Sequence, residues 1–290
     1  MASATTVVGL IAATVAVGTL ALNNDFTKDA AAADPPKIAA SAPSTANVVR
    51  VVGEDFRFEA PDAIPAGLTD FRFLNKGPGL HHLSILKLTD GRTVSDLRAA
   101  LAKPGPMPSW VKAIGGPNAP VPGLESNAIV NLAPGDYALI CFVDIDGPPH
   151  FARGMVQALT VTPATEVTAT TVTADASIDL FDYNFKVPTP VTPGRRTIKV
   201  TNTGDQVHEV ELVQLAPGVA VSDFMRWMAK REGPPPGKAI GGIAGMEPGM
   251  TEYFTADFAP GSYALICFVQ DAKDGKPHFV HGMIQQITVK

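Results

Sequence analysis

Two cysteines occupy equivalent places in a repeated phrase of the sequence. Residues 134–155 read PGDYALICFVDIDGPPHFARGM, and residues 260–283 read PGSYALICFVQDAKDGKPHFVHGM. Each copy contains one Cys, then a His, and then a Met placed by the spacing His-x4-Met. A further matched His lies upstream in each half, in NKGPGLHHLSIL and in NTGDQVHEVELV. Two imidazoles, a thiolate and a thioether are the donors of a mononuclear copper site, with the thioether as a weak axial ligand.

The duplication therefore supplies two candidate ligand sets. They are His81, Cys141, His150 and Met155 in the first half, and His208, Cys267, His278 and Met283 in the second. Taken singly, such a His is more often a hydrogen-bonded core residue, and a free Cys or a Met is more often core packing. The recurrence of all four residues at matched positions favours ligands over packing.

The alternation of side chains along a strand predicts which upstream His faces the core. His208, Val210 and Leu212 share one face of their segment, while Glu209 and Glu211 share the other. Because the apolar face must be the buried one, His208 is predicted to point inward. The same parity makes His81 the inward residue of the first half. His82, the counterpart of Glu209, is predicted to face solvent.

The composition indicates an all-β protein and excludes nucleic acid as a partner. The chain has 290 residues, 46% of them hydrophobic and 18% charged, with a net charge of −5 and no basic run to hold phosphates. Gly and Pro number 26 each, which suits many turns. The two cysteines occupy equivalent places in two copies of one unit, so a disulfide between them is not expected.

The N-terminal region is predicted to direct export. Residues 1–22 contain no charged side chain and, as a helix, would span roughly 33 Å, about the thickness of a bilayer core. A retained membrane anchor and a removed signal sequence are both consistent with this segment, and the anchor is preferred because no Lys or Arg precedes the apolar run. Residues 23–47 are rich in Ala, Pro and Ser and are predicted to form a flexible linker. The remainder is expected on the periplasmic side.

The rest of the chain is predicted to form two homologous domains, residues 48–163 and 175–290, joined by a linker at 164–174. Matches extend beyond the ligands, for example from Ala113-Ile114-Gly115-Gly116 to Ala239-Ile240-Gly241-Gly242. Alternating segments separated by turns predict seven or eight strands in each domain, as in a β-sandwich. One short helix is expected in each, with Ser95 or Ser222 as the N-cap.

The pattern Asn-x-Gly, inward His, Pro-Gly-x-Tyr, Cys and His-x4-Met resembles the cupredoxin family of blue copper proteins. The likeness covers nearly all of residues 48–290 and implies two tandem Greek-key β-sandwiches that bind copper through the eight residues above. Eight residues separate Cys from His in the first half, as in the loop of copper nitrite reductases, but ten do so in the second. The first site is therefore the better supported, and His281 is a possible competitor at the second.

The resemblance also bears on whether the chain is an enzyme. Two-domain copper enzymes of this family connect the blue site to a second copper centre through a His beside the Cys, but Ile and Phe flank both cysteines here. We therefore expect a protein that is not an enzyme and that transfers single electrons to a redox partner. The alternative is an accessory subunit of a membrane complex that uses these domains as a scaffold. A copper chaperone is a third alternative, but this chain lacks the Met-rich runs that would support it.

Overall fold

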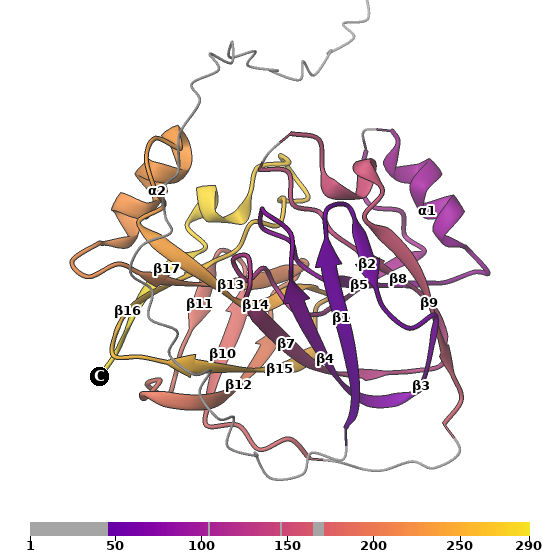
Figure 1. Cartoon of the computed structure of the whole chain (residues 1–290), viewed down its shortest axis with the longest axis horizontal. Helices are drawn as coiled ribbons and strands as arrows, with labels where there is room; N and C mark the ends of the chain where they lie inside the picture. Colours follow the sequence, from indigo (N-terminus) through magenta and orange to yellow (C-terminus); the bar gives the residue numbers. More distant parts are fainter. Residues whose placement is uncertain (1–45, 104, 146, 165–170) are drawn as a thin grey trace, which may run out of the picture. The chain divides into compact units, whose positions relative to one another are not determined.

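The computed structural model describes residues 46–103, 105–145, 147–164 and 171–290 (Figure 1). The predicted N-terminal segment at 1–22 and nearly all of the linker at 23–47 lie outside the described residues. Within the part of the chain that the structure describes, no helix is both long and apolar enough to cross a membrane.

The first half consists of nine strands, one α-helix and a 3-10 turn. These are β1 (Asn47–Glu54), β2 (Arg57–Glu59), β3 (Ala63–Pro65), β4 (Gly67–Asn75), β5 (Ser84–Leu88), α1 (Val94–Leu101), β6 (Val111–Gly115), β7 (Glu125–Leu132), β8 (Gly135–Ile140), η1 (His150–Arg153) and β9 (Val156–Thr162).

The second half repeats this order without a counterpart of β3. It contains β10 (Ala176–Phe181), β11 (Asn184–Lys186), β12 (Gly194–Asn202), β13 (His208–Leu215), α2 (Val221–Lys230), β14 (Gly237–Met246), β15 (Thr251–Phe258), β16 (Gly261–Ile266), η2 (His278–His281) and β17 (Ile284–Val289).

The strands form two sheets, and both sheets run through the two halves (Figure 1). One has the order β2-β1-β4-β7-β15-β12-β10-β11, and the other has the order β3-β9-β8-β5-β6-β14-β13-β16-β17. In each sheet, the strand order from the junction outward is the same in both halves, except that β3 has no counterpart among the described strands. The pairings across the junction are short: Tyr253 with Ile129 and Met246 with Ile114 in the sheets, and Pro117 with Ile243 and Pro120 with Ile240 as isolated bridges. Further backbone hydrogen bonds, such as that from the N–H of Val121 to the carbonyl of Ala239, also join the halves.

Glycines allow the two halves to approach closely at this junction. Gly115 has φ +120°, and a Cβ there would lie 2.2 Å from Oε1 of Glu252. Its counterpart Gly241 has φ +116°, and a Cβ there would lie 2.6 Å from Cβ of Ser126. Both the left-handed backbone and the lack of space require glycine. The matched Gly-Gly pairs of the sequence thus mark the contact between the halves.

The predicted mainly-β fold with one short helix in each half is confirmed, but several boundaries differ. The first alternating segment of each half is a hairpin rather than one strand, because Phe56 and Tyr183 adopt turn conformations with φ of 60° and 64°. Thr93 and Ala220 are the N-caps, so the prediction of Ser95 or Ser222 was wrong. Thr93 prevails because its hydroxyl accepts from the N–H of Asp96.

Candidate metal centres

The structure gathers His81, Cys141 and His150 into one buried group. Nδ1 of His81 lies 2.9 Å from Nδ1 of His150, and Sγ of Cys141 lies 3.5 Å from the same Nδ1. All three residues are at most 1% exposed. Two imidazole nitrogens and one sulfur, from residues that span 69 positions of the chain, thus lie close together.

The second half reproduces this geometry with His208, Cys267 and His278. The two Nδ1 atoms are 3.0 Å apart, and Sγ of Cys267 lies 3.5 Å from Nδ1 of His278. All three side chains are fully buried. The structure thus brings together the His and Cys residues predicted from the sequence in both halves, each set within 4.8 Å.

Backbone hydrogen bonds place the predicted methionines beside these groups. The N–H of Cys141 donates to the carbonyl of Met155, and the N–H of Met155 donates to the carbonyl of His150. Cys267, Met283 and His278 repeat both bonds. Each Met is fully buried in the same apolar cluster as its Cys. The intervening 3-10 turns end at glycines with φ of 116° and 107°, which turn the chain back toward the Cys.

The longer loop of the second half does not alter the inner geometry. Its two extra residues form a turn in which the carboxylate of Asp271 accepts from the N–H groups of Lys273 and Asp274. The prediction that the first site is better supported therefore finds no basis in these distances. His281, the predicted competitor, instead contacts Asp274 at 3.1 Å.

Each inward His packs on the glycine of its Asn-x-Gly turn. A Cβ at Gly77 would lie 2.2 Å from Nε2 of His81, and a Cβ at Gly204 would lie 2.6 Å from Nε2 of His208. Asn75 accepts from the N–H of Gly77 and donates to two carbonyls, which closes the turn. The turn residues predicted from the sequence thus shape the ring's pocket.

Asp and an aromatic residue from the first hairpin of each half cover the histidines, and sequence reasoning missed them. Oδ1 of Asp182 lies 2.7 Å from Nε2 of His208, whereas Oδ1 of Asp55 lies 3.5 Å from Nε2 of His81. The next residue in each hairpin, Phe56 or Tyr183, stands edge-to-face with the ring of the second His. The matched pairs Asp-Phe and Asp-Tyr in the repeat were the available signal.

The contact with Asp182 fixes which nitrogen of His208 faces the metal group. Nε2–H donates to the carboxylate, so the neutral ring has its lone pair on Nδ1. Burial lowers the pKa of His208, although Asp182 opposes this effect. Burial also lowers the pKa of His278 to about 4 and raises the pKa of the Cys267 thiol well above its ordinary value. The imidazoles are thus neutral donors at pH 7, and metal binding would displace the thiol proton.

The predicted exposure of His82 and Glu209 was wrong. They are 8% and 6% exposed, and Glu211 is 5% exposed. The parity argument placed the ligand histidines correctly, but it assumed that the opposite face was covered by water. In the second half that face is covered by the other half, where Asn118 contacts Glu209 and the N–H of Ala119 donates to Glu211. His82 is covered within its own half, where its ring packs against Phe142 and accepts from the N–H of that residue.

Burial changes the ionisation of these junction carboxyls. It raises the pKa of Glu209 to about 7 and that of Glu252 to about 8, and it raises the pKa of Glu211 well above its ordinary value. It also lowers the pKa of His82 to about 4, so that ring is neutral at pH 7. The junction between the halves is therefore polar, and its carboxyls keep their protons to a higher pH than ordinary glutamates do.

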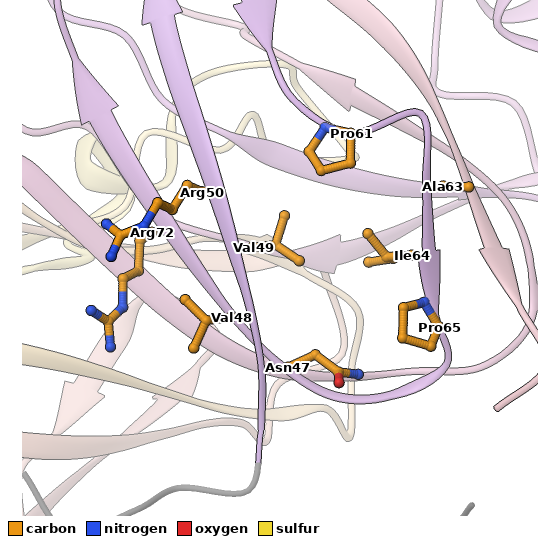
Figure 2. Close-up of a pocket in the computed structure, with 9 residues that line it drawn as sticks. All are labelled: Asn47, Val48, Val49, Arg50, Pro61, Ala63, Ile64, Pro65 and Arg72. Carbon is orange, nitrogen blue, oxygen red and sulfur yellow. The ribbon is translucent and has the colours of Figure 1, made fainter. Parts of the chain in front are cut away.

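The two His-Cys-His groups fit a type 1-like copper site. Two imidazoles and a thiolate suit copper, and the buried Met bonded through its backbone to each Cys would be available as a weak fourth donor. A third group, formed by Asp271, Asp274 and His281, has no sulfur and is mostly exposed. The surface pocket between β1 and β3, with Arg50 and Arg72 on one side, contains no member of the three groups (Figure 2).

Comparison with known proteins gives structural matches only. No protein-family model and no curated protein sequence matches the chain. Auracyanin from Roseiflexus castenholzii is 21% identical, with a TM-score of 0.29, and the match covers 41% of this chain and 98% of that one. A multicopper oxidase is 13% identical, with a TM-score of 0.25, and the match covers 84% and 88%. A copper-containing nitrite reductase from Thermus scotoductus is 13% identical, with a TM-score of 0.22, and the match covers 84% and 61%.

These identities are low, and the likeness concerns the fold alone. The predicted resemblance to the cupredoxins is confirmed, because the His and Cys residues of its ligand set converge in both halves. The prediction that the chain is not an enzyme is contradicted. Proteins matched over 84% of the chain include a multicopper oxidase and a nitrite reductase, both enzymes, and the chain has His-Cys-His groups of its own.

Proposed function

We propose that this cupredoxin-like chain binds one copper ion in each half and transfers single electrons. The observation that carries the proposal is the convergence of two Nδ1 atoms and one Sγ in a buried group, repeated in both halves. Residues that merely packed a core would not need to point three donor atoms at one place twice.

When bound, copper would supply one-electron exchange between its two oxidation states. The chain's own contribution is to hold the donors still. Backbone hydrogen bonds connect Cys141 to Met155 and Met155 to His150, which fixes the three residues relative to one another. Burial excludes water, and Phe56 covers the ring of His150. Ligand atoms that are held in place and shielded from water would move less when copper changes its oxidation state.

The finer organisation is part of the same proposal. We infer that residues 48–163 and 175–290 are two Greek-key sandwich domains of the cupredoxin type, and that 164–174 link them. We place them on the periplasmic side, held at the membrane by residues 1–22. The electron partner would be a redox protein or a membrane complex. The apolar uncharged segment at residues 1–22 supports this placement.

Titration of the purified full chain with Cu(II) tests the proposal. We expect the intense visible absorption of a copper–thiolate bond to rise until two copper ions are bound per chain. A Cys141→Ser, Cys267→Ser double variant is the control and should stay colourless. A wild-type protein that binds no metal would contradict the proposal, and its co-purification with a membrane assembly would favour the scaffold alternative.

A further inference from the structure

The loops that connect Cys to His are anchored differently in the two halves. Four residues after the Cys, the second half has Asp271 and the first half has Ile145. Asp271 is 5% exposed, and its carboxylate accepts from two N–H groups of its own loop, from the hydroxyl of Tyr183 and from the amide of Gln206. Ile145 is apolar and 42% exposed. The first loop therefore has no carboxylate anchor at this position.

An arginine of the second half contacts the first loop instead. Nη1 of Arg231 donates to the carbonyl oxygen of Ile145 at 2.6 Å. The same loop is closed at its base, where the N–H of His150 donates to the carbonyl of Val143 at 2.9 Å. A hydrogen bond from a charged donor is stronger than one between neutral groups. Arg231 therefore gives this loop a second fixed point, away from its base.

The backbone at Arg231 has a conformation that does not suit an arginine. Arg231 ends α2 with φ 54° and ψ 35°, in the left-handed region where Gly is the usual residue. Its N–H donates to the carbonyl of Trp227, and the indole N–H of Trp227 donates to the carbonyl of Gly233. The end of the helix alone would thus favour Gly at position 231. The contact with Ile145 gives a reason for a long, charged side chain there.

We propose that Arg231 positions the Cys–His loop of the first metal centre, so that the second half determines how firmly the first centre holds copper. The inference rests on the proposed function. Arg231 contacts no ligand itself and acts through the carbonyl of Ile145. The second centre needs no such help, because Tyr183 and Gln206, which anchor Asp271, belong to its own half.

Loop opening is the physical link between this contact and copper. His150 lies at the end of the loop, so its imidazole can move away from Cys141 only if the loop rearranges. Local openings of this kind are rarer where more hydrogen bonds must break at once. Loss of the contact from Arg231 should therefore let the loop open more often, and copper should leave the first centre more readily.

Amide hydrogen exchange of the metal-free full chain, followed by NMR, tests the loop itself. The amide of His150 reports on the first loop, and the amide of His278, which donates to the carbonyl of Val269, reports on the second. Arg231→Gly should make the His150 amide exchange several-fold faster and leave the His278 amide unchanged. Because Gly suits the backbone of position 231, this variant keeps the end of α2. Arg231→Lys, which keeps a charged donor, should restore part of the protection.

Copper release tests the consequence for each centre. The Cys267→Ser background isolates the first centre and the Cys141→Ser background isolates the second. With an excess of a Cu(I) chelator, Arg231→Gly should speed the loss of copper several-fold from the first centre and not from the second. Arg226→Gln is the matched control, because Arg226 lies on the same helix but pairs with Asp223. It should change neither exchange nor release.

The outcomes separate the two proposals. Wild-type exchange at His150 in Arg231→Gly, or wild-type copper release from the first centre, would overturn the positioning role and leave the proposed function intact. Faster exchange at both His150 and His278 would make Arg231 a residue of general stability and would also overturn that role. A wild-type chain that binds no copper would overturn the proposed function and, with it, the control of copper by Arg231.

Discussion

The two metal centres are nearly identical inside and different outside. The Nδ1 atoms are 2.9 Å apart in the first and 3.0 Å in the second, and Sγ lies 3.5 Å from the second His in both. Around them, Asp182 contacts His208 at 2.7 Å, whereas Asp55 stands 3.5 Å from His81. Phe56 covers one centre and Tyr183 the other.

The difference shows which features the repeat preserves. The donor atoms and the turns that aim them are the same in both halves, so each half has the means to bind the same metal. The residues that surround the donors vary in charge and hydrogen bonding, and these set affinity and potential. We therefore expect two centres of one type with different properties.

The largest effect should come from removing one thiol at a time. Cys267→Ser should abolish the absorption band of the second centre and halve the bound copper, because a hydroxyl is a poor substitute for thiolate. Cys141→Ser should do the same for the first centre. Copper analysis with visible spectroscopy measures both. Loss of both bands in either single variant would show that the centres are not independent sites.

Asp182→Asn should weaken the second centre more than Asp55→Asn weakens the first. The shorter contact orients His208 and raises its basicity, and loss of such a partner typically costs about 10–100-fold in metal affinity. Asp55 is half exposed and more distant. Competition titrations on single-site backgrounds, Cys141→Ser for the second centre and Cys267→Ser for the first, measure each affinity. Equal losses at both centres would contradict the comparison.

Glu252 should make the free energy of unfolding depend on pH, whereas its counterpart Ser126 should not. Burial raises the pKa of Glu252 from 4.5 to about 8, so between these values the folded chain holds a proton that the unfolded chain releases. Its contribution to stability is complete below pH 4.5 and is lost as the pH rises to 8, by at most about 1.4 kcal/mol per pH unit. Glu252→Gln should flatten this decline, as measured by urea unfolding.

Ser126→Ala is the matched control for that experiment. Its hydroxyl donates to the carbonyl of Asn118 and does not titrate in this range. The variant should lower the free energy of unfolding by a similar amount at every pH. An equally steep decline in Glu252→Gln and in the wild type would show that Glu252 is ionised in the folded chain.

The smallest effect should follow from Tyr183→Phe, which makes the cover of the second centre resemble that of the first. The hydroxyl donates to Asp271, and its loss should reduce the free energy of unfolding slightly. The copper band should shift little, because the ring still packs against His278. Denaturant unfolding and visible spectra check both parts. An unchanged stability would show that water replaces the hydroxyl.

The ligand sets could be predicted because their information is local and repeated. His81 was assigned inward by strand parity, and the Asn-x-Gly and Pro-Gly turns marked where the strands end. Asp182 and Tyr183 were missed because the turn between β10 and β11 was not recognised within a continuous alternation. In the structure the turn is defined by the antiparallel pairing of β10 with β11 and by the positive φ of Tyr183.

The junction between the halves could not be predicted from one half at a time. His82 and Glu209 have polar side chains on the face opposite the core, which is the usual pattern of a solvated strand. The burial of Glu209 depends on a long-range association in which Asn118 meets the other half, whereas His82 is covered by Phe142 of its own half. The repeated Gly-Gly pairs signalled a close contact, but nothing local identified their partners.

Diffraction from crystals of the copper-loaded full chain, recorded at the copper absorption edge, tests the central claim most directly. We predict two anomalous peaks, one among His81, Cys141 and His150 and one among His208, Cys267 and His278. Peaks at neither group, or a single peak at Asp271, Asp274 and His281, would contradict it.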